Sequence, residues 1–192
     1  MMMGRVVLLV PAAVVLLVAC GSSGGKATAP SSSLTTTSVS RVAVAHLNIP
    51  AGKDPSKSAR MICEPEARTD IASSLEVKET SVTKPTWHDH VYSCSYLYPQ
   101  GKVALSVKEL VNAEATTTYF DAILQKYGVT ERLPGFGQAA WILRNDDVVV
   151  RKDYKVLFVD VQGLPKQFTP KQTRADVAKS IAAVVMGCWT GA

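Results

Sequence analysis

The stretch AAWILRNDDVVVRKDYKVLFVDV, residues 139–161, decides the fold of this chain. Three runs rich in β-branched and aromatic side chains follow one another there, at 139–143, 147–151 and 155–161. Polar residues that favour tight turns separate the runs, namely Asn145-Asp146 and Lys152-Asp153. Short apolar runs bounded by turn residues are typical of strands joined by hairpins, so the stretch predicts an antiparallel meander of three strands.

A second hairpin is predicted upstream of this meander. Residues 90–98 and 102–110 alternate apolar with polar side chains, and the segment PQG between them supplies a turn. Because successive strand side chains point to opposite faces, Val103 and Leu105 are expected on one face. All five strands are expected to join one antiparallel sheet.

Three helices are expected around these strands. Apolar side chains recur at helical spacing in three segments. The first is 65–75. The second can be capped by Asn112 and ended by Gly128, and the third follows a capping box of Thr173 and Asp176. The predicted order is therefore α-β-β-α-β-β-β-α. This order predicts an α+β domain, in which the helices pack mainly on one face of an antiparallel sheet.

The N-terminus has the features of a secretory signal peptide, residues 1–19. Arg5 supplies the positive charge that precedes an apolar stretch, residues 6–19, as in signals for export. As a helix this stretch would be about 21 Å long, shorter than the bilayer's hydrocarbon core of about 30 Å. A permanent transmembrane span is therefore disfavoured.

The apolar stretch ends in Leu17-Val18-Ala19-Cys20, which resembles the lipobox of bacterial lipoproteins. The resemblance implies that the Cys20 thiol takes a diacylglycerol and that a signal peptidase cuts before it. The alternative is an uncleaved apolar anchor with a coincidental cysteine. Residues 20–40 are rich in Gly, Ser and Thr, a composition typical of a flexible tether.

These features predict where the protein resides. We expect a lipid-anchored protein on the extracytoplasmic face of the cell membrane, with a tether at 20–40 and a single domain at 41–192. Within that domain, residues 41–49 are expected to form a short strand or an extended arm. The membrane is the expected partner through Cys20.

Charge narrows the range of further partners. The formal net charge of +5 is spread along the chain without a run of Lys or Arg. Nucleic-acid binding normally needs a concentrated basic stripe, so no nucleic-acid partner is expected. A mild positive excess favours anionic lipid head groups and acidic polymers. An envelope protein, a lipid or a cell-wall polymer remain as candidate partners.

Three cysteines remain when Cys20 is acylated: Cys63, Cys94 and Cys188. An odd number in an oxidising compartment favours one disulfide and one leftover thiol. We favour Cys63 with Cys94, because the first starts a helix that would cover the strand containing the second. Closing this loop should stabilise the fold by about 3–4 kcal/mol. Cys188 would then be a buried thiol or form an intermolecular bridge.

The segment WHDH, residues 87–90, is the candidate metal site. At strand spacing His88 and His90 would point the same way, and with Cys94 or a carboxylate they could hold zinc or copper. A surface position at a strand entrance is favoured, so no metal and no cofactor are predicted. A metal-binding protein, or a metal-dependent hydrolase that uses both histidines, is the alternative.

Catalytic motifs are absent from the sequence. Gly135-Phe136-Gly137 lacks the context of a phosphate-binding loop and is expected to be a turn leading into a strand. Within the expected domain at 41–192, no serine lies in a Gly-x-Ser-x-Gly motif. The expected function is therefore a non-catalytic binding or structural module of the cell envelope.

Cys63 stands at the first expected helix, Tyr92-Ser93-Cys94 lies on an expected strand, and the segment GFGQA at 135–139 precedes paired strands and a closing Ala/Val-rich helix. These motifs resemble a group of uncharacterised lipoproteins from actinobacterial cell envelopes, a domain of unknown function. The similarity covers residues 62–185, and the terminal segment Gly187-Cys188-Trp189 departs from it. It implies a location and a fold, and no activity.

Overall fold

A computed structural model describes residues 51–190 of the chain. These residues belong to one compact unit. The predicted signal peptide, Cys20, the tether and the arm at 41–49 lie outside the described residues, so they stay predictions.

Two helices, four strands, a third helix, six strands and a final helix follow one another along residues 51–190. The helices are α1 (Lys57–Met61), α2 (Pro65–Leu75), α3 (Ala113–Tyr127) and α4 (Arg174–Thr190). The first five strands are β1 (Ser81–Val82), β2 (Thr86–His88), β3 (Val91–Tyr98), β4 (Gly101–Glu109) and β5 (Val129–Arg132). The others are β6 (Ala139–Leu143), β7 (Val148–Lys152), β8 (Lys155–Asp160), β9 (Gln167–Thr169) and β10 (Gln172–Thr173).

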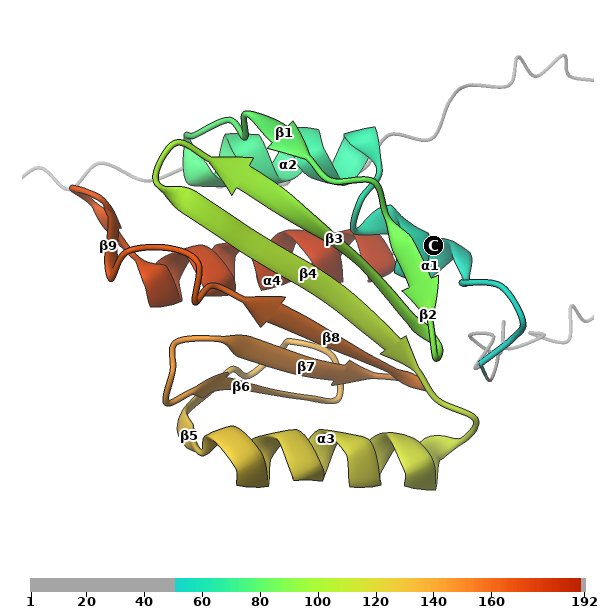
Figure 1. Ribbon diagram of the computed structural model, residues 1–192. Helices are drawn as coiled ribbons and strands as arrows, with labels where there is room; N and C mark the ends of the chain where they lie inside the picture. Colours follow the sequence, from blue (N-terminus) through green and yellow to red (C-terminus); the bar gives the residue numbers. More distant parts are fainter. Residues whose placement is uncertain (1–50, 191–192) are drawn as a thin grey trace, which may run out of the picture. The chain divides into compact units, whose positions relative to one another are not determined.

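One antiparallel sheet organises these elements (Figure 1). Its strands follow the order β1-β3-β4-β8-β7-β6-β5, and β2 pairs with β3 beside β1. The predicted hairpin and the predicted meander meet where β4 pairs with β8. Strands β9 and β10 form a separate two-stranded ribbon. The predicted α+β class with an antiparallel sheet is confirmed.

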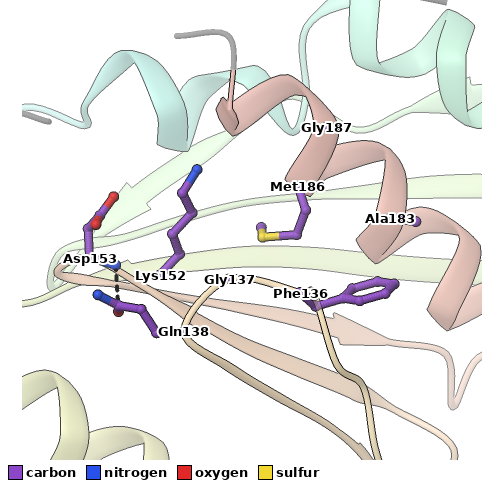
Figure 2. A pocket seen from close by; sticks show the side chains of 9 residues that line it. Phe136, Gly137, Gln138, Lys152, Asp153, Ala183, Met186 and Gly187 are labelled. Carbon is purple, nitrogen blue, oxygen red and sulfur yellow. Dashed lines mark hydrogen bonds between the residues drawn. The ribbon is translucent and has the colours of Figure 1, made fainter. Parts of the chain in front are cut away.

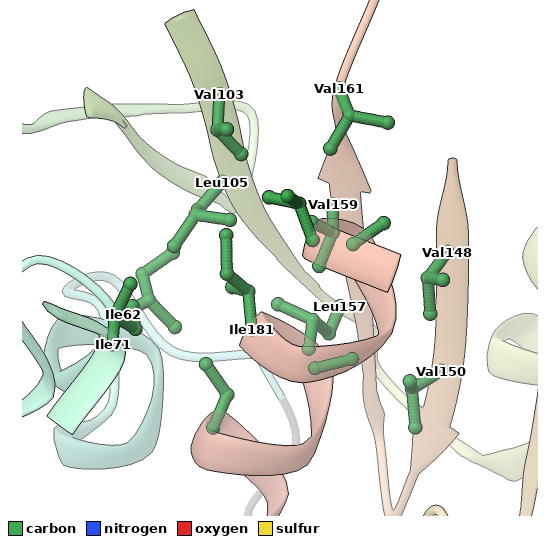
Figure 3. Packing of buried hydrophobic residues seen from close by; sticks show 14 of the residues in the cluster. Ile62, Ile71, Val103, Leu105, Val148, Val150, Leu157, Val159, Val161 and Ile181 are labelled. Carbon is green, nitrogen blue, oxygen red and sulfur yellow. The ribbon is translucent and has the colours of Figure 1, made fainter. Parts of the chain in front are cut away.

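The two faces of the sheet are covered by different helices. On β7, Val148 and Val150 point into the larger apolar cluster, which also contains buried residues of α1, α2 and α4. Val149 points to the opposite face and packs with buried residues of α3. Figure 3 shows the larger cluster, where Leu157 of β8 lies beside Ile181 of α4. Helices therefore lie mainly on one face, as expected, and α3 covers part of the other.

Predicted caps define the ends of two helices. The side chain of Asn112 accepts a hydrogen bond from the Ala115 N–H at 2.8 Å, and Gly128 follows the last residue of α3 with a positive φ of 67°. At α4, the Thr173 N–H donates to an Asp176 oxygen at 2.9 Å, and the Asp176 N–H donates back to the Thr173 hydroxyl oxygen at 3.2 Å. Both predicted capping interactions are confirmed.

The start of β7 lies one residue later than expected because the side chain of Asp147 turns inward. Asp147 was expected to start a strand, but it belongs to the turn before β7 and is 2% exposed. Its carboxylate accepts hydrogen bonds from the Val161 N–H at 2.9 Å and from Asn145 and Gln162. Burial raises the pKa of this carboxyl, and the bonds from Gln162 and Val161 partly offset that rise.

Candidate functional site

A groove of about 540 Å³ runs between the C-terminal half of α4 and the loop that leads into β6. Its volume lies within the range of roughly 300–1,000 Å³ that is typical of small-molecule pockets. Nine residues line it: Gly135, Phe136, Gly137, Gln138, Lys152, Asp153, Ala183, Met186 and Gly187. The groove is more apolar than a second large groove along α2 and is the candidate site.

The first wall is the loop between β5 and β6. Gly137 has a φ of +58°, and a Cβ added to it would lie 2.6 Å from the carbonyl oxygen of Arg151. Only glycine fits this position, because both the backbone conformation and the close approach exclude a side chain. The loop therefore lies directly against β7 and holds the half-buried Phe136 ring at the groove.

Helix α4 forms the second wall. Ala183, Met186 and Gly187 are spaced by three and four residues, so they share one face of the helix. Met186 is largely buried, whereas Ala183 and Gly187 are exposed. Small residues beside a flexible thioether leave an open apolar surface along the helix.

Two hydrogen bonds fix the rim of the groove at the β7–β8 turn. The Asp153 N–H donates to the Gln138 side-chain oxygen at 2.9 Å and ties the turn to the loop (Figure 2). The Lys152 ammonium donates to the carbonyl oxygen of Trp189 at 2.8 Å and ties the turn to the end of α4. The two walls are thus held apart by the turn, and three polar side chains lie at one edge of the groove.

The lining of the groove is mainly apolar. Phe136, Ala183 and Met186 supply apolar side chains, and three glycines expose backbone. Lys152 and Asp153 are the two ionisable side chains among the nine lining residues. This arrangement can hold an apolar group.

A second, more polar groove of about 610 Å³ lies along α2. Arg68 and Glu79 line it, and the Arg68 guanidinium contacts one Glu79 carboxylate oxygen at 2.8 Å. The other Glu79 oxygen, Oε2, is buried without a hydrogen-bond partner. The ion pair closes the base of this groove, so Glu79 has a structural role beneath α2.

Two buried tyrosines lie near that ion pair. The Tyr96 hydroxyl donates to the carbonyl oxygen of Ile62 at 2.7 Å, whereas the Tyr98 hydroxyl is buried without a hydrogen-bond partner. Burial raises the pKa of both phenols, and the negative charge of Glu79 raises it further. Both tyrosines are therefore neutral and serve packing, with the Tyr98 ring edge-on to Phe168.

The predicted geometry of His88 and His90 is wrong. Asp89 and His90 have positive φ angles of 47° and 57°, and they form the two-residue turn that joins β2 to β3. Because a turn and not a continuous strand connects His88 to His90, the two side chains do not share a strand face. The His88 ring contacts the Asp89 carboxylate at 2.9 Å, and His90 lies edge-on to Trp87. Within residues 51–190, no three His, Cys, Asp or Glu side chains gather as a metal site.

The structure contains the disulfide that the sequence favours. Cys63, just before α2, is bonded to Cys94 on β3, with 6.1 Å between their Cα atoms. Cys188 lies in α4 as a buried thiol whose sulfur is 3.9 Å from an Asp70 carboxylate oxygen. The disulfide joins α2 to the sheet and lies apart from the lining of the groove.

The groove itself was not predicted. The segment Gly135-Phe136-Gly137 was expected to be a turn, which it is, but its role as a wall depends on α4 packing beside it. The usable signal was the pair Ala183 and Gly187, two small residues that lie one helical turn apart.

Comparisons with protein-family models, with curated proteins and with solved structures found no significant match to this chain. Among residues 51–190, no helix has the length and hydropathy that a bilayer span requires.

Proposed function

We propose that this chain is a membrane-anchored extracytoplasmic lipoprotein whose α+β domain is a non-catalytic binding module. The Leu17-Val18-Ala19-Cys20 pattern and the tether composition support the lipid anchor. The disulfide between Cys63 and Cys94 is consistent with an oxidising compartment. The proposed similarity to actinobacterial envelope lipoproteins agrees with the same location.

The apolar groove beside α4 is the observation that carries the binding role. Its polar lining residues lie at one edge, where Gln138 and Lys152 already form hydrogen bonds within the protein. The remaining surface of the groove is apolar and open. Covering apolar surface with a ligand removes it from water, which makes the free energy of binding favourable. A small molecule with an apolar surface is the ligand that this lining favours.

The anchor is tested by changing Cys20. Wild-type chain and Cys20→Ser, both expressed with the native signal, are separated into membrane and soluble fractions. We expect wild type in the membrane fraction and the variant in the soluble or secreted fraction, because two acyl chains attach a protein durably. A variant that is processed normally and stays with membranes as firmly as wild type would contradict the proposed anchor.

The binding role is tested by identifying the small molecules that copurify with the protein. Wild type and Gly187→Leu, which places a side chain in the groove, are purified from the same cells, and extracted small molecules are compared by mass spectrometry. We expect a compound that accompanies wild type and is depleted from the variant. Identical extracts from both proteins would contradict a ligand in this groove.

A further inference from the structure

The rim of the apolar groove lies close to the point where the described chain begins. Asp153 lines the groove, and the carbonyl oxygen of the next residue, Tyr154, accepts a hydrogen bond from the Leu110 N–H at 2.8 Å. The carbonyl oxygen of Leu110 accepts one from the Ala51 N–H at 3.0 Å. The first described residue is therefore two backbone hydrogen bonds away from the groove rim.

This position matters if Cys20 carries the anchor. A chain with the Gly/Ser/Thr-rich composition of the predicted tether, residues 20–40, has a root-mean-square span of about 25 Å, and the predicted arm at 41–49 adds its own length before Ala51. The bilayer surface would then lie within reach of the groove rim. The tether would also keep the local concentration of membrane lipids around the domain high, so even a site of low affinity would be occupied.

The lining selects among the apolar molecules that a membrane offers. A peptide would bring N–H and C=O groups along its whole length that need partners, but the polar side chains of the lining, Gln138, Lys152 and Asp153, lie only at one edge of the groove (Figure 2). A hydrocarbon chain needs no such partners. Its flexible methylenes match the Met186 thioether, which adapts its shape to irregular contacts.

We propose that the groove beside α4 holds the hydrocarbon chain of a single-chain membrane amphiphile drawn from the bilayer to which the protein is tethered. The proposal rests on the proposed function and names the ligand class of the same groove. Phe136, Ala183 and Met186 contact the chain, and its polar head lies toward the rim at Lys152 and Asp153.

Gly187 provides a clean way to block the groove. A Cβ added to Gly187 would meet no atom within 4 Å, so a larger residue enters open space. A side chain at this helical position points back over the preceding turn, toward Ala183 and into the groove. Replacing a helical glycine also favours the helix, so Gly187→Leu is expected to melt at or above the wild-type temperature.

The experiment uses the purified mature chain with Cys20→Ser, so that the protein's own acyl chains cannot occupy the groove. Saturated fatty acids of increasing length, kept below micelle-forming concentrations, displace the fluorescent dye N-phenyl-1-naphthylamine. We expect affinity to rise by up to about fourfold for each added methylene, the value of burying one CH₂, and then to level off when the groove is full.

Three variants in the same background complete the test. Gly187→Leu should weaken fatty-acid binding about tenfold or more, because it displaces several buried methylenes. Gly187→Ala adds a single methyl group and controls for the helix, and Thr118→Leu adds the same leucine to an exposed position of α3. Both controls should bind within about threefold of the unblocked chain.

The outcomes separate this inference from the proposed function. Binding without chain-length dependence, or equal binding by Gly187→Leu and wild type, would overturn the hydrocarbon assignment. If native extracts nevertheless yield a different compound that Gly187→Leu loses, the binding module stands and only its ligand class is wrong. If neither experiment responds to Gly187→Leu, both proposals fail.

Discussion

The Lys152 ammonium donates a hydrogen bond to the carbonyl oxygen of Trp189 at 2.8 Å, so a residue of the β7–β8 turn satisfies the last turn of α4. The final carbonyls of a helix lack intrahelical partners, and a positive charge there also complements the helix dipole. This contact closes one edge of the groove. It links the stability of α4 to the geometry of the candidate site.

We expect Lys152→Met to destabilise the protein by about 0.5–1.5 kcal/mol, the usual net value of one intramolecular hydrogen bond. Methionine keeps the apolar stem of the side chain and removes the donor. Urea unfolding at equilibrium measures the difference. Lys166→Met, at an exposed position, is the control and should change stability by less than about 0.5 kcal/mol. Equal effects of both variants would show that the contact contributes nothing.

Tyr96 and Tyr98 form a matched pair on the same face of β3. Tyr96→Phe removes the donor to the Ile62 carbonyl oxygen and should cost about 1–2 kcal/mol, because the buried oxygen loses its partner. Tyr98→Phe removes a hydroxyl that has no partner and should be neutral or slightly stabilising. Thermal unfolding of both variants decides the matter. Similar losses in both would show that the Tyr98 hydroxyl has an unseen partner, such as a water molecule.

The disulfide should be present in the exported protein. Non-reducing peptide mapping is expected to recover Cys63 linked to Cys94, and Cys188 should react with iodoacetamide only after unfolding because it is 5% exposed. The double variant Cys63→Ser/Cys94→Ser should lose about 3–4 kcal/mol, since its unfolded chain regains the entropy of an open loop. A bridge that includes Cys188 would contradict this pairing.

The sequence predicted the long elements better than the short ones. Residues 65–75 and 139–143 match α2 and β6 to the residue. In α2, apolar residues recur at helical spacing after Pro65, and β6 is an apolar run that ends before the turn residues Asn145-Asp146. The strands β1, β2, β5, β9 and β10 have two to four residues each, and α1 has five. Segments this short contain only one or two periods of a pattern. So short a pattern cannot be told from chance, and tertiary packing defines these elements.

The candidate site was harder to predict for a related reason. The sequence identifies Gly137 as a turn residue. However, the Arg151 carbonyl oxygen, which leaves no room for a side chain at Gly137, belongs to β7 and is distant in the sequence. The same holds for His90, whose positive φ depends on the two-residue turn between β2 and β3. Local patterns identify a turn, whereas a groove or a shared face depends on which elements meet.

His88 and His90 allow a direct test of metal binding, the alternative function considered from the sequence. The His88 side chain is 86% exposed at the end of β2, and His90 belongs to the turn that follows. The double variant His88→Ala/His90→Ala should therefore change stability by no more than about 0.5 kcal/mol. Zinc or copper should leave the melting temperature of wild type unchanged. A ligand at a hundredfold excess over its Kd would instead add about 2.7 kcal/mol. Such a shift, lost in the double variant, would make metal binding the better function.

The capping box at the start of α4 should make stability depend on pH. Hydrogen bonds from the Thr173 hydroxyl and N–H lower the pKa of Asp176 below its ordinary value of 3.8. A carboxyl whose pKa is lowered by folding stabilises the folded state above its unfolded pKa, and this contribution is lost as the pH falls through the lowered value.

We therefore expect Asp176→Asn to cost about 0.3–1 kcal/mol at neutral pH, the usual value of a negative charge in the first turn of a helix. The difference from wild type should shrink in unfolding measurements made in steps below pH 3.8, where wild-type Asp176 also takes up a proton. Asp121→Asn, exposed in the middle of α3, provides the control and should show neither effect. A cost for Asp176→Asn that stays constant across this pH range would mean that the carboxylate charge is irrelevant, and that α4 begins at Thr173 because of its hydroxyl alone.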